Sequence, residues 1–334
     1  MTKDATLSLR NKRKCKNRRF KMFKRQNYVF DVPDSKKVRM IVYTDCKNEA
    51  DDQYALAHHI MTPAFIIPGI IAAHFNGNPQ RFGDGHTAQA SYDEVEKVLD
   101  LMHVREEFTV YKGSEYPLTD AQTPQVSEAA KFIMEEAMKD DPHPLFIACQ
   151  GSITDLASAI MMEPKICERM TAIWIGGGIY PEGGREFNLF MDPNAANVLF
   201  NSKMPVWQVP MDVYKQMSVT LAELQRKVMP YGKIGKYLVE QMVEFNNSHA
   251  NDKPWPHGEI WGLGDQGTIA VMLEEAEKTD IYEEIEAPNF DLTDGHYTYG
   301  HGNRKIRVYH TLNARTTLED FFCKLQLNFQ EADS

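Results

Sequence analysis

Apolar and polar residues alternate along this chain in the order that is typical of α/β proteins. Short apolar runs, suited to buried parallel strands, occur at Val38 to Tyr43, Gly69 to Ala73, Pro144 to Cys149, Thr171 to Ile175, Pro205 to Val209 and Lys305 to Tyr309. Stretches with apolar residues at helical spacing cover Gln53 to Met61, Thr87 to Met102, Val126 to Met138, Leu156 to Met162, Asn194 to Phe200, Leu221 to Met229, Gly235 to Asn247, Thr268 to Glu277 and Leu318 to Leu325. In the second of these helices the charged positions are expected to face water, namely Glu94, Glu96, Lys97 and Asp100. Strands and helices alternate with no repeat or linker after residue 37, which predicts an α/β fold with a mostly parallel sheet in a single domain, residues 38–334.

Charge divides the chain unevenly. The net charge is −10 over 334 residues, yet the segment from Lys3 to Arg25 carries eleven Lys and Arg against one acid, Asp4. Such a basic block is typical of a disordered tail, here residues 1–37, although targeting signals and nucleic-acid arms share this composition. The rest of the chain is strongly acidic, which argues against a nucleic-acid polymer as partner.

Cysteine spacing and hydropathy indicate which class of protein and which compartment to expect. The five cysteines are scattered and form no CxxC pair, so we expect free thiols rather than disulfides or a zinc site. No apolar run approaches the ~18 residues of a membrane span, and the N-terminus lacks the apolar core of a secretory signal. We therefore expect a cytoplasmic protein without a membrane partner.

One stretch, from Thr44 to Asp52, concentrates the candidate chemistry. Three aspartates and one glutamate, Asp45, Glu49, Asp51 and Asp52, directly follow the first predicted strand. Carboxylates this close lose hydration and repel one another when buried, so the stretch requires a counter-charge. Because open α/β sheets bind ligands at the carboxyl ends of their strands, we expect a cation there.

Five blocks in order make the chain resemble the inosine-uridine preferring nucleoside hydrolase family, over roughly residues 38 to 325. They are Thr44-Asp45 to Asp51-Asp52, Gln150 to Leu156, Gly176 to Gly178, Glu186 to Pro193 and Gly264-Asp265. The acidic loop is two residues longer than the usual family form, as in a divergent nucleoside hydrolase-like branch. The resemblance implies an open, doubly wound α/β sheet with a Rossmann-like core and helices on both faces. It also implies a homo-oligomer, dimer or tetramer.

The resemblance also implies a set of site residues. Asp45, Asp52, Asp265 and the Gln150 carbonyl would hold one Ca²⁺, and the all-oxygen donor set agrees with that ion while leaving Mg²⁺ open. Asp45 would also act as general base on water held by the metal. The ribose would be bound by Asp51, Asn76, Glu186, Phe187 and Asn188.

Simpler roles compete with several of these assignments. Asp265 could serve only as the N-cap of the following helix, and Glu49 could be solvated. Asp192 before Pro193 is expected to start a helix. Gly176 to Gly178 lacks the spacing of a phosphate loop and is expected to form a tight turn.

The largest departure from the family lies on the side of the leaving group. Many members place a histidine directly before the last ligand aspartate, and here that position is Gly264. Polar residues expected near that side are more often packing or surface residues than acids; they are His257, Trp261, His296, Tyr297, Tyr299 and His301. The segment Tyr180 to Gly184 is also shortened, which leaves recognition of the 5′ end of the sugar open.

The sequence therefore predicts calcium-dependent hydrolysis of the N-glycosidic bond of a ribonucleoside, or of a related ribosyl compound, to ribose and free base. Three alternatives stay open. The same metal site could hydrolyse another glycoside, the chain could be a non-catalytic ribosyl-binding protein, or the clustered aspartates could belong to a metal phosphohydrolase.

Overall fold

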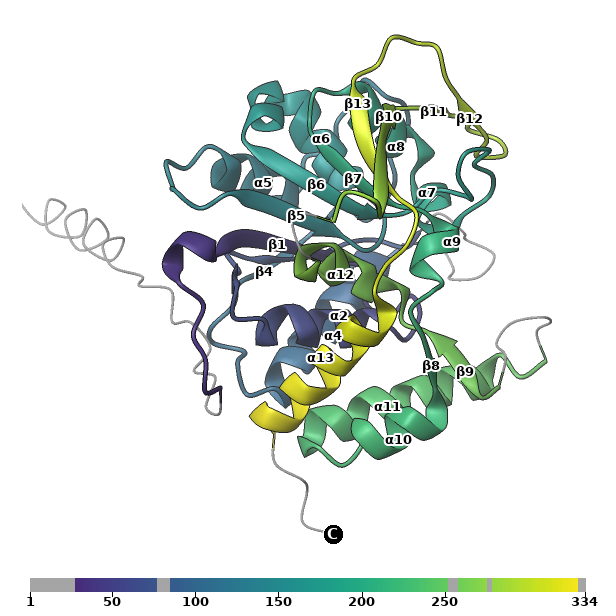
Figure 1. Cartoon of the computed structure of the whole chain (residues 1–334). Coiled ribbons are helices and arrows are strands. Elements are labelled where there is room, and N and C mark those ends of the chain that lie inside the picture. Colours follow the sequence, from purple (N-terminus) through teal and green to yellow (C-terminus); the bar gives the residue numbers. More distant parts are fainter. Residues whose placement is uncertain (1–27, 77–84, 252–257, 275–277, 330–334) are drawn as a thin grey trace, which may run out of the picture.

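A computed structural model describes residues 28–76, 85–251, 258–274 and 278–329. Its centre is one sheet of nine strands with the order β10-β13-β7-β6-β5-β1-β3-β4, in which the short β2 pairs with β1 (Figure 1). All pairs are parallel except β10 with β13. The strands are β1 (Val38–Thr44), β2 (Phe65–Ile66), β3 (Ile70–Ala72), β4 (Val110–Lys112), β5 (Leu145–Cys149), β6 (Met170–Ile175), β7 (Val206–Val209), β10 (Tyr282–Glu286) and β13 (Lys305–Tyr309).

Helices cover both faces of this sheet. Figure 1 shows α5 (Glu128–Ala137), α6 (Thr154–Met162) and α8 (Pro193–Asn201) on one face. The other face carries α2 (Asp52–Met61), α4 (Thr87–Leu101), α12 (Gly267–Leu273) and α13 (Ala314–Asn328), with α10 (Leu221–Lys227) and α11 (Gly232–Ser248) outside them. The predicted open, doubly wound α/β architecture is confirmed.

Strand residues alternate between two hydrophobic cores, as the period of two in a strand requires. Met40 and Val42 of β1 belong to the core under α2, α12 and α13, whereas Ile41 and Tyr43 belong to the core under α5, α6 and α8. Because the strands are buried on both faces, they appear in the sequence as continuous apolar runs.

Short elements connect and border this frame. Two small antiparallel sheets pair β8 (Ser218–Thr220) with β9 (Ile260–Gly262) and β11 (Asn289–Phe290) with β12 (Tyr297–Thr298). The remaining helical turns are η1 (Asp34–Lys36), η2 (Pro164–Glu168), α7 (Phe187–Met191), α9 (Met211–Tyr214) and η3 (Gly264–Gln266). Across the described part of the chain, no helix combines the length and apolarity needed to cross a membrane.

The sequence predicted the long elements within a few residues but missed two edge strands, β4 and β10. Strand β10, with the sequence Tyr-Glu-Glu-Ile-Glu, lies at the sheet edge, where charged residues are common and the apolar signal is weak. The expectation that Glu94 faces water is wrong. Glu94 is buried and accepts hydrogen bonds from Gln53 Nε2 at 3.1 Å and from the Tyr237 hydroxyl, since α4 packs between α2 and α11.

Much of the predicted tail, residues 1–27, lies outside the described residues, as does His257. In the described part, 28–37, the Tyr28 hydroxyl donates to the Met61 carbonyl at 3.0 Å and accepts from Asn328 Nδ2 at 2.8 Å. The chain just before β1 is therefore hydrogen-bonded to α2 and α13.

Candidate functional site

Acidic side chains from several strand ends meet in a small pocket of about 60 Å³. The loop after β1, with the first residue of α2, contributes four of the acids, Glu186 follows β6, and Asp265 follows β9. The lining residues are Asp45, Asn48, Glu49, Asp51, Asp52, Gln150, Ile175, Glu186, Phe187, Asn188, Tyr214, Gly264 and Asp265. Nearly every residue that the sequence predicted for the site therefore lies around one cavity at the carboxyl edge of the sheet.

Asp51, Asp52 and Asp265 form the tightest group in this pocket. One carboxylate oxygen from each lies within 4.8 Å of the others, and all three residues are buried. None of them caps a helix. The carboxylate of Asp51, the residue before α2, makes no cap hydrogen bond, and the cap residue of α12 is Gln266 rather than Asp265. Capping therefore does not account for their burial, and their spacing suits a single metal ion.

Asp45 lies beside this group, held from two sides. Asn48 Nδ2 donates to Asp45 Oδ2 at 3.1 Å, so the side chain is oriented within its own loop. On the other side, a Cβ atom on Gly151 would lie only 2.4 Å from Asp45 Cγ. Glycine at 151 therefore leaves the space that the Asp45 carboxylate occupies.

These acids have no basic partner among the described residues. No Lys, Arg or His forms an ion pair with Asp45, Asp51, Asp52 or Asp265 in the part of the chain that the structure describes. Lys47, within the same loop, lies instead with its ammonium 3.8 Å from Glu94 Oε2. The site thus has oxygen donors without a counter-charge.

Burial of unpaired carboxyl groups shifts their titration. Burial raises the pKa of Asp45 well above its usual range, and the nearby carboxylates of Asp52 and Glu49 raise it further. Burial also raises the pKa values of Asp51 and Asp265, and it raises the pKa of Asp52 to about 7 although the Thr44 hydroxyl opposes the shift. Without a cation, burial therefore makes these carboxyl groups harder to ionise.

Two unsatisfied oxygens lie beside the carboxylates. Gln150 Oε1 and Asn48 Oδ1 are buried and accept no hydrogen bond in the described structure. The Gln150 carbonyl accepts from Asn188 Nδ2 at 3.2 Å, which fixes its direction at the pocket edge. Carboxylates, a carbonyl and unpaired amide oxygens are the ligands that hard divalent cations prefer, so the residues present fit Ca²⁺ or Mg²⁺.

Glu186 and Asn188 tie the strand ends together. Both carboxylate oxygens of Glu186 accept hydrogen bonds, from the backbone N–H groups of Gly177, Asn188 and Leu189 and from the Tyr214 hydroxyl, at 2.9 to 3.1 Å. Burial raises the pKa of Glu186, and these donors oppose the rise. Asn188 Nδ2 also donates to the Ile175 carbonyl at 2.9 Å, so this pair holds the turn after β6 in place.

The turn itself, Gly176 to Gly178, is a tight turn rather than a phosphate loop, as predicted. Gly177 has a φ of 89°, and a Cβ there would lie 2.2 Å from the Tyr297 hydroxyl oxygen. Asp192 also has its predicted role, since it caps α8 by accepting from Ala195 N at 2.9 Å.

Tyr214 occupies the side of the pocket next to Gly264. A Cβ on Gly264 would lie 2.9 Å from Tyr214 Cδ2, so the tyrosine ring fills the space into which a side chain at 264 would grow. The Tyr214 hydroxyl donates to Glu186 Oε1 at 2.9 Å, and burial raises its pKa well above the usual range. Ring and glycine are therefore matched in shape.

Several predicted or considered residues lie away from the pocket. Asn76 is not among the lining residues, because its side chain bonds to the Glu115 carbonyl at 3.2 Å and to Gly85 N at 3.4 Å. Of the polar residues considered near the leaving group, none that the structure describes lines the pocket; these are Trp261, His296, Tyr297, Tyr299 and His301.

Sequence reasoning missed Asn48 and Tyr214 and expected Glu49 to be solvated, whereas it lines the pocket. The signal for Asn48 was its position three residues after Asp45 in the acidic loop. Tyr214 closely follows the end of β7, so its place after a strand end is a weak signal that the sequence offered for it.

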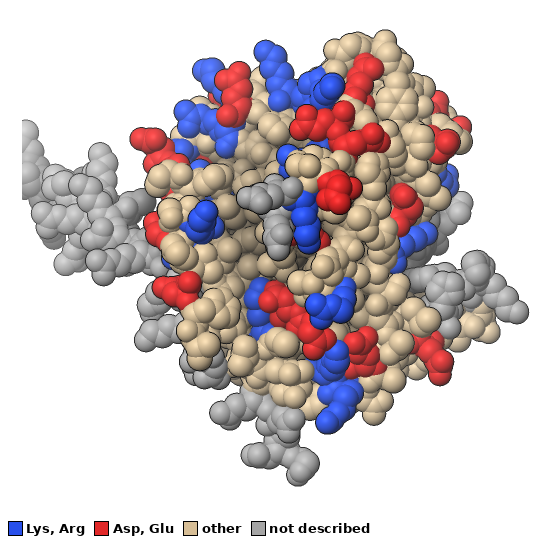
Figure 2. Space-filling model, in the orientation of Figure 1, with Lys and Arg blue, Asp and Glu red and all other residues tan. Residues whose placement is uncertain are grey.

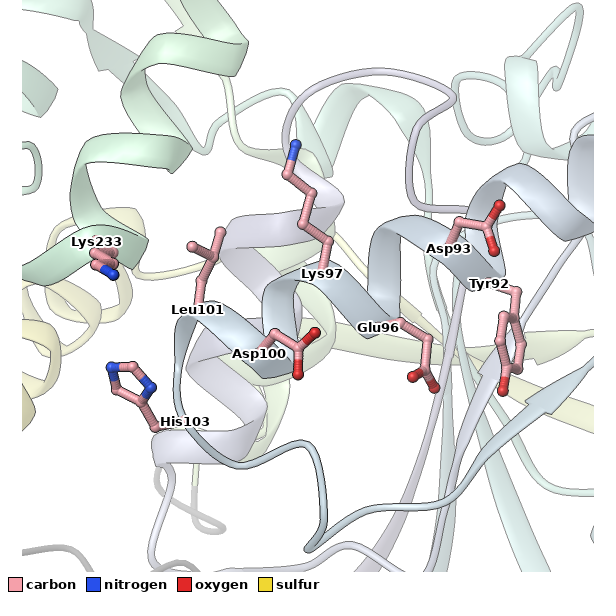
Figure 3. Close-up of a pocket in the computed structure, with 8 residues that line it drawn as sticks. All are labelled: Tyr92, Asp93, Glu96, Lys97, Asp100, Leu101, His103 and Lys233. Atoms are coloured by element: carbon pink, nitrogen blue, oxygen red, sulfur yellow. The ribbon is translucent and has the colours of Figure 1, made fainter.

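A second, larger hollow of about 550 Å³ lies on the outer surface of α4 (Figure 3). Its charged side chains fan out from successive turns of α4 rather than converge, and Lys233 reaches it from α11. Acids and lysines are mixed there, as they are over the whole face drawn in Figure 2. This hollow lacks the convergent groups that a chemical site needs.

Comparison with known proteins connects the pocket to a family. The family model described as inosine-uridine preferring nucleoside hydrolase matches residues 40–319. The pyrimidine-specific ribonucleoside hydrolase RihA of Klebsiella pneumoniae is 24% identical over 281 residues, which is 77% of this chain and 85% of that protein. The inosine-uridine preferring nucleoside hydrolase of Crithidia fasciculata is 27% identical over 230 residues, 64% of this chain and 73% of that protein.

Solved structures share the fold. The purine-preferring ribonucleoside hydrolase from Gardnerella vaginalis superposes with a TM-score of 0.68 at 18% identity, covering 87% of this chain and 99% of that one. An inosine-guanosine nucleoside hydrolase gives a TM-score of 0.65 at 17% identity, covering 89% and 99%. The family match thus includes the acidic loop after β1, the Glu186 block and Asp265.

Proposed function

The chain belongs to the inosine-uridine preferring nucleoside hydrolase family and is an enzyme of the N-glycosyl hydrolase type, and on this premise we propose a specific reaction. The enzyme hydrolyses the N-glycosidic bond of a ribonucleoside, or of a related ribosyl compound, to ribose and free base, with Ca²⁺ as cofactor. The observation that carries the proposal is the pocket itself, where four buried aspartates without a basic partner among the described residues adjoin Glu186 and Asn188.

Oxygen donors around the pocket support calcium as the cofactor. Asp45, Asp52, Asp265 and the Gln150 carbonyl would hold the ion, which supplies positive charge that orients and polarises water and sugar hydroxyls. Asp51 belongs to the same close group as Asp52 and Asp265, so its proposed contact with the ribose hydroxyls lies directly beside the ion. A calcium affinity that falls more in Asp52→Asn than in Asp51→Asn would support this division of roles.

Asp45 is the proposed general base. As the C–N bond to the base breaks, its electron pair goes to the base nitrogen and positive charge develops on the sugar, which the surrounding carboxylates stabilise. The oxygen of a water molecule bonds to the anomeric carbon, and Asp45 accepts the proton that this water loses. Hydrogen bonding from Asn48 and the space beside Gly151 keep the carboxylate in one position for this step.

Glu186, Phe187 and Asn188, which follow β6, are proposed to bind the sugar. All three line the pocket, and the hydrogen bonds of Glu186 and Asn188 hold this part of the pocket rigid. Asn76 stays a proposed sugar contact, although it does not line the pocket. We also propose a homo-oligomer and a cytoplasmic location, which size measurement in solution and cell fractionation test.

A substrate panel tests the reaction. The purified chain is incubated with Ca²⁺ and inosine, uridine and other ribosides, then with glycosides and phosphoesters, and release of reducing sugar and of phosphate is measured. We expect ribose from at least one N-riboside and no phosphate. Phosphate release without ribose, or tight riboside binding without any ribose over long incubation, would contradict the proposal.

A further inference from the structure

One buried histidine on α2 joins the two chain segments that supply the clustered aspartates. Asp51 and Asp52 stand at the start of α2, and Asp265 belongs to η3, which packs against α2. His58, further along α2, is fully buried, and its Nδ1 atom lies 2.6 Å from Oε1 of Gln266, the residue after Asp265. Gln266 is equally buried. A buried polar contact thus links α2 to η3 one residue from Asp265.

A second contact holds the other side of the His58 ring. Nε2 lies 2.9 Å from Oδ2 of Asp320 on α13, which packs beside α2 (Figure 1). The same oxygen pairs with Lys324. The pKa of Asp320 is lowered, since burial is outweighed by hydrogen bonding from His58 and by the charge of Lys324. Because a carboxylate only accepts hydrogen bonds, Nε2 of His58 carries the hydrogen.

The protonation of the ring determines which atom of Gln266 faces it. Burial lowers the pKa of His58, and the charge of Lys324 lowers it further, so the ring is neutral and has a single N–H. With that N–H at Nε2, the Nδ1 atom is an acceptor and needs a donor. Turning the Gln266 amide by 180° supplies one, and it gives an acceptor to Nε2 of Gln266, which otherwise has no partner among the described residues. The amide of Gln266 therefore donates to the imidazole.

Repulsion between the aspartates makes a link between their segments necessary. Burial raises the pKa of Asp265, and the charges of Asp51 and Asp52 raise it further. When these groups are ionised, their repulsion favours separation of η3 from α2 until a cation binds. A direct contact between the segments is long, since the Asp265 backbone N–H lies 3.4 Å from Asp51 Oδ2. The hydrogen bond between Gln266 and His58 opposes the separation without adding charge to the site.

We propose that His58 is a positioning residue for the metal site, which through Gln266 holds Asp265 at the distance from the start of α2 that one divalent cation needs. This inference rests on the proposed calcium site. Asp320 fixes the ring from α13, so the last helix of the fold contributes to the metal site without touching it. His58 takes no part in the chemical steps. Loss of the link weakens cation binding before any substrate is present.

Calcium affinity of the full chain tests the proposal without a substrate. Protein stripped with a chelator is titrated with CaCl₂ by calorimetry, for the wild type, His58→Phe, Gln266→Met and the double variant. Each single change should raise the Kd for Ca²⁺ roughly tenfold, the lower range for groups that orient metal ligands. The double variant should lose about as much as either single one, because both changes remove the same hydrogen bond. Gln266→Met keeps the length of the side chain, so it tests the link even where His58→Phe is too unstable to purify.

His59→Phe is the matched control. His59 is the next residue on α2 and is equally buried, but its Nδ1 atom bonds to the Ala55 carbonyl of the same helix at 2.9 Å rather than to η3. We expect this variant to change the Kd by less than about twofold, even where urea unfolding of the stripped protein shows lower stability. A Kd that rises as much in His59→Phe as in His58→Phe would overturn the inference.

The outcomes distinguish the inference from the proposed function. Wild-type affinity for Ca²⁺ in His58→Phe and Gln266→Met would overturn the positioning role and leave the calcium site standing. Losses that add to roughly 100-fold in the double variant would do the same, because the two residues would then act independently. A wild type that binds no Ca²⁺ would count against both.

Discussion

The two ends of strand β1 bury acids in opposite ways. At its start, buried Arg39 donates to Glu136 Oε1 at 2.9 Å and to the Glu136 carbonyl at 3.1 Å, so the buried carboxylate has its cation built into the chain. At its end, Asp45 and the aspartates around it are equally buried, and no described basic residue pairs with them. Arg39 and Thr44 belong to the same seven-residue strand, and Asp45 follows that strand directly, so both groups of acids are positioned by β1.

This difference indicates which end of β1 belongs to the functional site and which end is structural. A buried acid with a fixed partner is structural, because its charge is satisfied whether or not anything binds. A buried acidic cluster without a partner lowers stability unless a cation is supplied from solution, and such a site is kept only if the cation has a use. The carboxyl end of β1 is therefore the candidate site, and the amino end is part of the framework.

Removing one acid at the functional end should have the largest effect. We expect Asp45→Asn to lower turnover roughly 1,000-fold, the range lost with a general base, while the fold persists. Initial rates of ribose release and circular dichroism measure the two effects. Near-normal activity in this variant on a confirmed substrate would show that the base is another residue.

Removing Arg39, the partner of Glu136 at the start of β1, tests whether that end of the strand has a structural role. Arg39→Met should lower the free energy of unfolding by about 1–3 kcal/mol, because Glu136 loses its buried partner and keeps, among the described cations, only the exposed Lys139. The double variant with Glu136→Met should recover much of that loss. Urea unfolding measures both, and kcat of the folded fraction should stay unchanged. A double variant as unstable as the single one would mean that Arg39 acts through packing and its carbonyl contacts.

Filling the space beside Asp45 tests whether its position matters. Gly151→Ala places a Cβ where the Asp45 carboxylate lies, and we expect kcat to fall roughly 100-fold, as a displacement of about 1 Å can cost that much. Ala at exposed Gly262, where a Cβ would meet nothing within 4 Å, is the matched control. A fully active Gly151→Ala enzyme would exclude tight positioning of the base.

The smallest expected effect is a pH dependence confined to the metal-free protein. Burial raises the pKa of folded Asp52 to about 7, against about 3.9 in the unfolded chain. Between pH 4 and 7 the folded state keeps a proton that the unfolded state loses, so stability falls as pH rises through this window, by on the order of 1 kcal/mol or more. Urea midpoints with chelator at pH 5 and pH 8 should differ less in Asp52→Asn than in the wild type. Equal differences would contradict the assignment.

The sequence predicted the framework and most of the site for one physical reason, namely that parallel strands buried on both faces end in polar loops at a common edge. That logic located the acidic stretch Thr44 to Asp52, whereas the resemblance to the nucleoside hydrolase family implied Gln150, Glu186 and Asp265; all of these line one pocket, apart from Thr44, Cys46, Lys47 and Ala50. The sequence prediction failed where tertiary packing decides whether a residue is buried. Glu94 follows the pattern of a surface residue, yet Gln53 and Tyr237 enclose it.

Tyr214 shows the second kind of failure. Its position shortly after β7 is only a weak signal, because its role depends on the missing side chain of Gly264, 50 positions away in the chain. Asn76 was predicted to contact the sugar, but it does not line the pocket, because its side chain is hydrogen-bonded to Glu115 and Gly85. A linear sequence pattern does not show these contacts. Complementary shapes between distant segments are visible only in three dimensions.

The most direct test of the account is ribose release from a confirmed N-riboside before and after removal of divalent cations. With a chelator present, activity should disappear and the melting temperature should drop. Ca²⁺ added in excess should restore both. At a free concentration of 100 times its dissociation constant, the ion should stabilise the folded protein by about 2.7 kcal/mol. Asp265→Asn should show little of this recovery. Full ribose release in the presence of the chelator, with an unchanged melting temperature, would contradict a cation as the missing partner of these aspartates.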